Sequence, residues 1–269
     1  MKDIACHVCG SRRYRIFGTC GRNRIVICRE CALFYVNPIP ENHNLVEYVE
    51  KSDRYTDDQL KKVSFFQKRA ENLFRRIEKI ISPGRILDIG CAIGTALIVA
   101  RERGWEGTGI ELSQASVEIA KRKGLRIISI PIESGDLDGE RFDLITMGHV
   151  LEHIAAVDPF FLKISLILRS KGLLYISVPN VKAWQFYFKR QNYTWTFHDD
   201  HLIHFSVTTL ARLIRKFGFK VVEIYTSRWR DFHDGLGSHS LLFRAINQVV
   251  ERMGMGIEIH CLAQKDGGS

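Results

Sequence analysis

Runs of apolar positions divide the sequence into segments with different periods. Over residues 57–81, apolar side chains recur at steps of three and four, which predicts one long amphipathic helix. From residue 84 onward, short apolar runs alternate with longer stretches that have a helical period. The runs expected to be strands are 85–89, 107–111, 126–130, 142–147, 173–178, 219–225 and 257–263. Several are almost continuously apolar, as strands are when both faces of their sheet are covered.

Helix boundaries between these runs follow the usual capping signals. Ser113, Asp158 and Ser206 each stand at the start of a predicted helix, where a short polar side chain can cap free amides. Gly124 and Gly218 stand where the first and third of these helices are expected to end. Alternation of strands and helices of this kind predicts a doubly wound α/β sheet.

Composition adds limits on the class of protein. The chain has 269 residues, of which 45% are hydrophobic and 26% are charged, as in a globular protein with a core. No apolar run approaches the roughly 18–20 residues of a membrane span, and the first residues lack the apolar stretch of a signal peptide. We therefore expect a cytoplasmic protein without a membrane span.

The net charge leaves two interpretations open. It is +9 in total, and residues 1–35 carry seven Lys and Arg against two Asp and Glu, a surplus of +5. The remaining positive charge is scattered, without a long block of one sign. The chain is either a protein with a mildly basic surface or one that binds nucleic acid.

Four of the seven cysteines form two pairs with the same spacing. Cys6 and Cys9 are one pair, Cys28 and Cys31 are the other, and 18 residues separate the pairs. This spacing is typical of structural zinc sites, in which four thiolates leave no open coordination position. We expect a Zn²⁺ ion that stabilises a segment too small to fold alone. Two disulfides are the alternative, which a reducing compartment disfavours.

The predicted zinc ribbon covers residues 1–40. Its strands are expected at 13–17 and 24–27, with Gly18 and Gly21 at the turn between them. Other possible metal ligands, which break the symmetry of the pairs, are His7 and Cys20.

The rest of the chain divides into two predicted domains. Residues 41–82 would form a helical cap, and residues 83–269 would form the sheet domain. A tract rich in aromatic side chains, which follows the fifth strand of the sheet, is expected to form an inserted lid over residues 180–206. Its aromatic residues are Trp184, Phe186, Tyr187, Phe188, Tyr193, Trp195 and Phe197.

The turn after the first strand of the sheet carries the clearest chemical signal. Asp88, Gly90 and Gly94 lie where that strand runs into a helix. Glycines at such a turn let a ligand approach the backbone, and the helix N-terminus favours negative charge. Glu111 ends the next strand, where an acid can accept hydrogen bonds from both ribose hydroxyls. These features predict a bound nucleoside.

Two cofactors compete for this turn. A dinucleotide fingerprint that starts at Gly90 needs glycine at the positions of Ala92 and Thr95, so it fails twice. The turn resembles instead that of the class I S-adenosylmethionine-dependent methyltransferases, with Ala92 in place of a middle glycine. The resemblance implies a seven-stranded Rossmann-like sheet whose last strand is antiparallel, and S-adenosylmethionine as cofactor.

Further segments extend the resemblance over nearly the whole chain. Residues 142–145, 150–154 and 168–180 look like those of the branch that contains ubiquinone-biosynthesis O-methyltransferases. The zinc ribbon, residues 37–40 and residues 201–206 resemble relatives of that branch that are linked to sugar, lipid or natural-product modification.

The resemblance implies a role for each residue around the cofactor. Asp88 would reach the methionine ammonium, and Glu111 would hold the ribose hydroxyls. Ile132 and Glu133 would cover the adenine, and His149 would lie beside the sulfonium. The predicted cofactor-binding residues are Asp88, Gly90, Cys91, Gly94, Glu111, Leu112, Ile132, Glu133 and His149.

Catalysis needs a group that removes the proton of the attacking hydroxyl or amine, and histidine suits this at neutral pH. The predicted catalytic residues are His149, His201 and His204, and His153 is expected to cap and orient its own helix. In relatives that act on catechol-like substrates, acids and histidines in this region can bind a divalent metal. Here His149 replaces one of the acids.

Taken together, these features favour a methyltransferase that acts on a small-molecule, sugar or lipid-like acceptor, with oxygen as the nucleophile. The alternative is an RNA or protein methyltransferase that docks through the basic zinc ribbon. A binding protein that has lost its activity is a third hypothesis, which the intact Asp88, Gly90, Gly94 and Glu111 disfavour.

Overall fold

The computed structural model describes residues 3–40, 53–134, 137, 139–189, 196–227 and 249–267. Part of the predicted helical cap and part of the predicted lid, including Tyr193 and Trp195, lie outside the described residues. Among the described helices, none has both the length and the apolar composition that a bilayer span requires.

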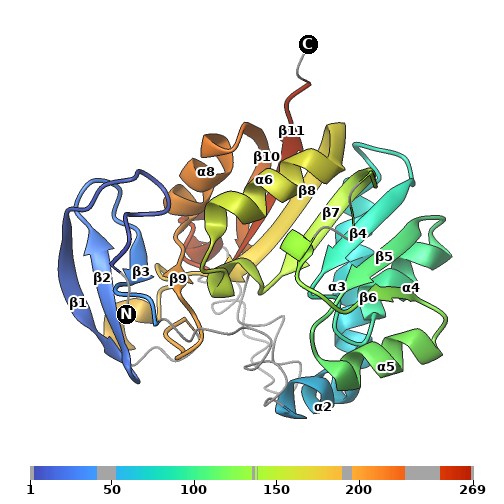
Figure 1. Cartoon of the computed structure of the whole chain (residues 1–269), viewed down its shortest axis with the longest axis horizontal. Helices are drawn as coiled ribbons and strands as arrows, with labels where there is room; N and C mark the ends of the chain where they lie inside the picture. The colour runs from blue at the N-terminus through green and yellow to red at the C-terminus, as the bar shows by residue number, and fades with distance from the viewer. Residues whose placement is uncertain are drawn as a thin grey trace. The chain divides into compact units, whose positions relative to one another are not determined.

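A seven-stranded sheet forms the centre of the fold, as the sequence predicts. Its hydrogen-bonded order is β10-β11-β8-β7-β4-β5-β6 (Figure 1). The strands are β4 (Arg85–Ile89), β5 (Glu106–Ile110), β6 (Arg126–Ile128), β7 (Phe142–Gly148), β8 (Leu168–Pro179), β10 (Phe219–Ser227) and β11 (Glu258–Lys265). β4 pairs in parallel with β5 and β7, and β5 pairs in parallel with β6. The last strand is antiparallel, so the Rossmann-like fold class is confirmed.

Helices follow the strands at the predicted places, and one short helix that was not predicted, α7 (Phe186–Lys189), lies in the expected lid. The helices at predicted places are α4 (Thr95–Glu102), α5 (Gln114–Arg122), α6 (Val157–Ile167) and α8 (Val207–Lys216). Ser113 caps α5 by accepting from the Ser116 amide, and Ser206 forms a capping box with Thr209 at the start of α8. Gly124 and Gly218 follow the ends of these two helices with positive φ. The capping signals in the sequence therefore mark real helix boundaries.

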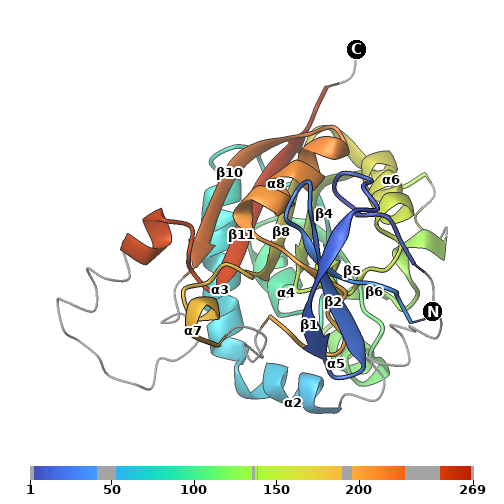
Figure 2. The same cartoon turned by 90° about the vertical axis from the view of Figure 1, so that its left-hand side faces the viewer.

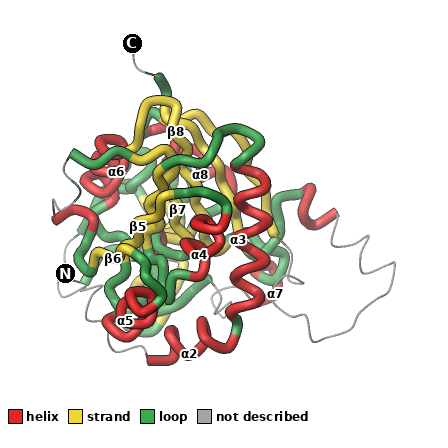
Figure 3. Tube along the Cα trace, turned by 90° about the vertical axis from the view of Figure 1, so that its right-hand side faces the viewer, coloured by secondary structure: helices red, strands yellow, loops and turns green. Residues whose placement is uncertain are grey.

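The single helix predicted over residues 57–81 is wrong. The structure has two helices there, α2 (Asp53–Lys61) and α3 (Val63–Ile77), because Lys62 adopts a non-helical backbone conformation. The side chain of Thr56 in α2 lies 2.9 Å from the Ser116 hydroxyl of α5, a contact that ties α2 to α5. α3 packs instead on α4, which covers β5 (Figure 3).

A second sheet of four strands has the order β1-β2-β3-β9. The predicted hairpin is present as β1 (Tyr14–Cys20) and β2 (Asn23–Cys28), which cross in Figure 2. The turn contains Gly21, whereas Gly18 lies within β1 at an irregularity in the pairing. Two short strands were not predicted: β3 (Phe34–Val36) and β9 (Ile203–His204), which pairs with β3.

The chain forms two compact units, each assembled from separate stretches of sequence. Unit 1 contains residues 1–43, 149–158 and 176–264, and in it α8 packs along β10 (Figure 2). Unit 2 contains residues 44–148, 159–175 and 265–269. The domains predicted from the sequence are consecutive stretches, whereas these units are not.

Candidate active site

The turn between β4 and α4 is left-handed at three positions. The φ angle is +72° at Gly90, +49° at Ala92 and +77° at Gly94. Glycine adopts this conformation freely, but it costs other residues roughly 1–2 kcal/mol, so Ala92 carries strain. At Gly94 a Cβ atom would also lie 2.2 Å from Cδ1 of Leu125, so the Leu125 side chain would have to move. The glycine pattern of the sequence thus reflects the backbone of this turn.

Asp88 is a buried acid next to this turn, with 8% of its surface exposed. Its register in β4 places it between Gly109 of β5 and Thr146 of β7. The Thr146 hydroxyl donates a hydrogen bond of 2.7 Å to Oδ1 of Asp88. Burial raises the pKa of Asp88 to about 7; the Thr146 hydrogen bond lowers it, and the nearby Glu111 raises it further. A cation bound beside Asp88 would favour its charged form.

Glu111 is also buried, and three backbone amides hold its carboxylate. Oε1 accepts from the amides of Leu112 at 2.8 Å and Ser113 at 2.9 Å, and Oε2 accepts from the amide of Ala92 at 2.8 Å. A carboxylate has about four acceptor positions, so roughly one remains for a ligand hydroxyl. If Glu111 holds both ribose hydroxyls, as the resemblance implies, one of the amide contacts must be exchanged.

The other residues predicted at the cofactor surround the same strand ends. Cys91 and Ile132 are buried, Leu112 is half-buried, and Glu133 is exposed in the short helix η1 (Ile132–Ser134). With Asp88 and Glu111 they lie in unit 2, near the carboxyl ends of β4, β5 and β6, where open α/β sheets bind ligands. His149 belongs to unit 1.

His149 directly follows β7 and has a φ of +55°. Its ring lies between two buried carboxylates, with Nδ1 3.3 Å from Oε1 of Glu152 and Nε2 3.1 Å from Oε1 of Glu258. Burial alone would lower the pKa of His149, but the two carboxylates raise it to about 10. A protonated ring has no lone pair, so this arrangement does not favour His149 as the general base.

His201 and His204, the other predicted catalytic residues, are anchored to one carbonyl group. Their Nδ1 atoms donate to the Thr196 oxygen at 2.8 and 3.0 Å. His204 is 2% exposed, and its ring centre lies 4.7 Å from that of Phe197. Burial lowers the pKa of His204 to about 3, which keeps the ring neutral. This placement favours a structural role for His204, whereas His201 lies beside Glu152 and His153.

Comparison with known proteins decides the family. The profile of the methyltransferase domain matches residues 60–224, which is more than half of the chain. The chain belongs to the methyltransferase domain family. The ubiquinone biosynthesis O-methyltransferase of Bartonella quintana is 32% identical to it over 108 residues, which cover 37% of this chain and 44% of that protein. The chain spans less than half the length of the curated relatives it matches.

Solved structures share the fold of this methyltransferase domain. The 1,6-didemethyltoxoflavin-N1-methyltransferase of Burkholderia thailandensis, solved with S-adenosylhomocysteine, has a TM-score of 0.58 and 20% identity and covers 88% of this chain and 97% of its own. The [4+2]-cyclase SpnF has a TM-score of 0.52 and 21% identity, and it covers 73% of this chain and 81% of its own. The fold therefore hosts more than one reaction, and function must be argued from the site.

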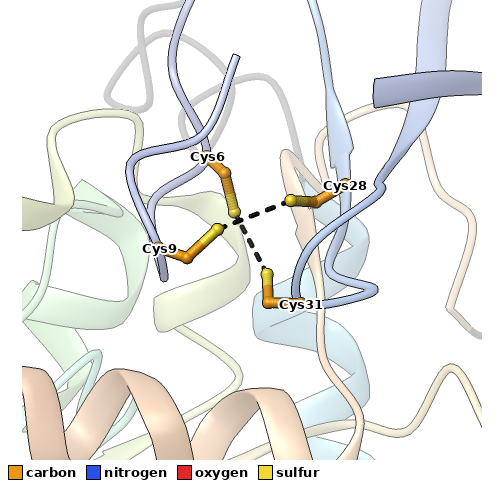
Figure 4. A group of neighbouring side chains, drawn as sticks. All are labelled: Cys6, Cys9, Cys28 and Cys31. Atoms are coloured by element: carbon orange, nitrogen blue, oxygen red, sulfur yellow. Dashed lines mark hydrogen bonds between the residues drawn. The ribbon is translucent and has the colours of Figure 1, made fainter. Parts of the chain in front are cut away.

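The four paired cysteines of the ribbon precede the residues matched by the family profile, and their side chains converge (Figure 4). Their sulfur atoms all lie within 4.8 Å of one another, at 3.4 Å for Cys6 and Cys31 and 3.5 Å for Cys9 and Cys28. A disulfide bond is about 2.05 Å long, so these thiols are free. Tetrahedral zinc with Zn–S bonds of about 2.3 Å separates sulfurs by about 3.8 Å, which this donor set fits. Neither His7 nor Cys20 belongs to the group.

The aromatic residues of the predicted lid separate into two sets. Phe186 and Phe197 are buried, and they pack with Phe17 and Phe34 of the ribbon strands. The exposed set is Trp184, Tyr187 and Phe188. The buried rings hold this segment against the ribbon sheet, so they are not available to an acceptor.

The sequence analysis missed the polar partners of these side chains. Thr146 binds Asp88, and Glu258 lies beside His149. Glu258 is the acid inside the run 257–263 that was predicted to be a strand, which is a signal of a buried acid with a partner. The Thr196 carbonyl left no such signal, because every residue has a carbonyl group.

Proposed function

We propose that the protein transfers a methyl group from S-adenosylmethionine to an oxygen atom of a small-molecule, sugar or lipid-like acceptor. The observation that carries this proposal is the pair of buried acids at the glycine turn. Two buried carboxylates, Asp88 and Glu111, repel a pyrophosphate and attract a ligand with an ammonium and a sulfonium group. S-adenosylmethionine has both cations and a ribose, and NAD has a pyrophosphate.

Each residue of the turn then has a definite task. Asp88 accepts a hydrogen bond from the ammonium group, and Glu111 accepts from a ribose hydroxyl. Gly90 and Gly94 let the backbone approach the ligand. The side chains that would surround the nucleoside are Cys91, Leu112, Ile132 and Glu133. When bound, S-adenosylmethionine supplies a methyl group on a positively charged sulfur, so the chain needs mainly to align the acceptor and exclude water.

An oxygen acceptor is supported by the name of the curated relatives and by the histidines of unit 1. His201 and His204 both have the Nε2 lone pair of a neutral ring, because Nδ1 donates to the Thr196 carbonyl and burial lowers the pKa of each. His201 is the proposed base, because it lies beside Glu152 and His153, whereas His204 is almost fully buried. His149 would act as a charged group that orders Glu152 and Glu258. We assign His204 to the packing of this segment.

The four ribbon cysteines are proposed to bind a structural zinc ion. Four thiolates complete a tetrahedral site, so this ion would take no part in methyl transfer. Cys6, Cys28 and Cys31 are buried, and Cys9 is exposed.

The basic ribbon gives little support to RNA as the acceptor, because several of its arginines already have partners. Arg13 pairs with Glu30 at 3.1 Å, and Arg24 donates to the carbonyl of Asn37 at 2.7 Å. RNA docking predicts binding at low salt that weakens steeply as salt rises. We expect no binding even at low salt, as measured by fluorescence anisotropy.

Calorimetry tests the proposed cofactor first. S-adenosylhomocysteine is expected to bind the full chain, and NAD is expected to produce no heat. The reverse result would refute the proposal. Incubation of the protein with S-adenosylmethionine and a pool of hydroxylated metabolites should then give products heavier by one methyl group, and fragmentation should place that group on oxygen. Methylation found only on RNA or protein would contradict the small-molecule acceptor.

A further inference from the structure

A cavity of about 700 Å³ lies within unit 1. Its described lining comes from four stretches of sequence: the start of the expected lid, the start of α8, the end of β10, and residues 251–255 shortly before β11. The predicted catalytic and cofactor-binding residues are not part of this lining. Pockets of roughly 300–1,000 Å³ hold whole small molecules, so this cavity has room for an organic ligand.

Hydrogen bonds join the walls of the cavity to one another. The buried Asn180 side chain donates to the carbonyl of Gly256 at 2.7 Å, and the amide of Trp184 donates to the carbonyl of Met255 at 3.0 Å. The Gly256 amide in turn donates to Oγ1 of the buried Thr226 at 3.1 Å. Because three of its walls share these bonds, the cavity is a preformed feature of the fold.

Two positively charged side chains, Lys182 and Arg252, line the cavity. Neither forms a salt bridge with another described residue, whereas Lys216, the last residue of α8, pairs with Asp158 at 2.6 Å. One carboxylate, that of Glu251, also lines the cavity. Two cations against one carboxylate leave a surplus of one positive charge, which favours an anionic ligand.

The start of α8 adds hydrogen-bond donors to the same cavity. The Ser206 hydroxyl caps this ten-residue helix by accepting from the Thr209 amide. The amides of Val207 and Thr208 have no partner within the helix, because the first turn has no preceding carbonyls. Both residues line the cavity. Amides at a helix N-terminus attract an anion, so they act in the same direction as the two cations.

The rest of the lining suits a ring that carries hydroxyl groups. Tyr187 is 53% exposed at the cavity, and the ring of Tyr225 stacks on that of His260 with centres 4.7 Å apart. Each tyrosine offers a flat apolar face and a hydroxyl group. The hydroxyl of Thr208 and the carboxylate of Glu251 can accept hydrogen bonds from ligand hydroxyls.

We propose that this cavity binds a phosphate monoester of a hydroxylated ring compound, such as a sugar phosphate. Lys182 and Arg252 hold the phosphate, which has nearly two negative charges at neutral pH and accepts paired hydrogen bonds from a guanidinium group. Glu251 disfavours a second anion and accepts from the hydroxyls. A sugar phosphate also offers oxygen atoms for methylation; that link rests on the proposed function, whereas binding itself does not.

Calorimetry of the full chain with glucose 1-phosphate tests the inference. Wild type should bind this probe more tightly than inorganic phosphate, and glucose should produce no heat. Lys182→Gln and Arg252→Gln each remove a charge-assisted hydrogen bond, so each should weaken binding about tenfold or more. The controls are Lys220→Gln in β10 and Arg212→Gln in α8, which alter exposed cations outside the lining and should leave the affinity unchanged.

Hydrogen exchange locates the bound probe. Glucose 1-phosphate should slow exchange at 206–208 and 251–256 and leave 85–111 unchanged. Its affinity should be the same when S-adenosylhomocysteine is present at saturation. Protection confined to 85–111, or competition with S-adenosylhomocysteine, would place the phosphate at the glycine turn and overturn the inference.

Lysophosphatidate, used below its micelle concentration, distinguishes a lipid from a ring compound, because it has the same phosphate on a lipid. Binding of lysophosphatidate without binding of glucose 1-phosphate would refute the proposed ligand class. Equal affinity of wild type and both cavity variants for glucose 1-phosphate would refute the proposed location.

Controls separate this inference from the proposed function. Circular dichroism shows whether each variant is folded, and S-adenosylhomocysteine binding reports on the other unit. Binding of S-adenosylhomocysteine without glucose 1-phosphate would refute the cavity site and leave the methyltransferase proposal intact. Binding of glucose 1-phosphate without S-adenosylhomocysteine would support the cavity site and contradict the methyltransferase proposal.

Discussion

The glycine turn of unit 2 and a histidine group of unit 1, which consists of Glu152, His153 and His201, balance their buried charges in different ways. At the turn, Glu111 accepts from three backbone amides, and Asp88 accepts from Thr146. In the histidine group, Glu152 has both oxygens buried without a hydrogen-bond donor in good geometry among the described residues. The local backbone of the turn thus holds its carboxylates, whereas in the histidine group the charge of Glu152 is balanced by the protonated ring of His149.

The two regions also differ in how far apart their residues lie along the chain. Asp88, Ala92 and Glu111 lie within 24 consecutive positions, and one strand–helix–strand unit brings them together. Glu152, His201 and Glu258 come from three distant segments of unit 1. A change in the ribbon should therefore disturb the second region and leave the first intact.

The largest effect is expected from Cys28→Ala. Structural zinc contributes on the order of 10 kcal/mol to the folding of such segments, so its loss should unfold the ribbon sheet, including β9. Hydrogen exchange should become fast at 14–36 and 203–204 and stay slow at 85–111. Cys20→Ala, a ribbon cysteine outside the group, is the control and should exchange like wild type. Equal loss of protection in both regions would show that the glycine turn also depends on the ribbon.

Asp88→Asn tests the turn itself. It keeps the size of the side chain and removes the charge, and loss of one partner of a buried charge pair costs about 2–5 kcal/mol. Calorimetry should show S-adenosylhomocysteine binding weakened about 100-fold. In the control, Glu118→Gln, the altered side chain is an exposed one of α5 outside the predicted site, and we expect the affinity to change by less than about threefold. Wild-type affinity in Asp88→Asn would remove Asp88 from the site.

The raised pKa of Asp88 predicts a pH effect of moderate size with opposite signs for stability and binding. Because its pKa is higher in the folded protein than in the unfolded chain, its contribution to stability is complete below pH 4 and is lost as the pH rises through about 7. Cofactor binding needs the charged form, so affinity should rise roughly tenfold from pH 5.5 to 7.

Thermal melting without ligand measures how stability changes with pH, and calorimetry at each pH measures how cofactor affinity changes. Asp88→Asn should remove the contribution of this group to each of them. A wild-type affinity that stays constant over this range would show that Asp88 does not titrate there.

The smallest effect is expected from Ala92→Gly. Glycine relieves left-handed strain of about 1–2 kcal/mol and loses about 0.4–1 kcal/mol through the greater entropy of the unfolded chain. The unfolding free energy should therefore rise by between about 0 and about 1.6 kcal/mol, with cofactor affinity retained. Ala100→Gly, within α4, should instead destabilise by about 1 kcal/mol. A clear loss of stability in Ala92→Gly would show that the alanine methyl packs usefully.

Much of the fold followed from the sequence because its signals are local. Strand positions came from short apolar runs, and helix ends came from Ser113, Ser206 and Gly218. The division of the helix at Lys62 could not be predicted, because the apolar period continues through that residue and the contact of α2 with α5 joins segments distant in the chain. β9 has two residues, too few for any period to be recognised.

The sequence by itself determined the glycine turn and the cysteine pairs. There, backbone conformation and ligand spacing depend on residues close together in the chain. Only the tertiary structure decided the surroundings of the histidines. It placed His149 between Glu152 and Glu258, anchored His201 and His204 on one carbonyl, and buried Phe186 and Phe197 against the ribbon. Protonation and accessibility are set by such neighbours, and neighbours from distant segments leave no mark in the local order of residues.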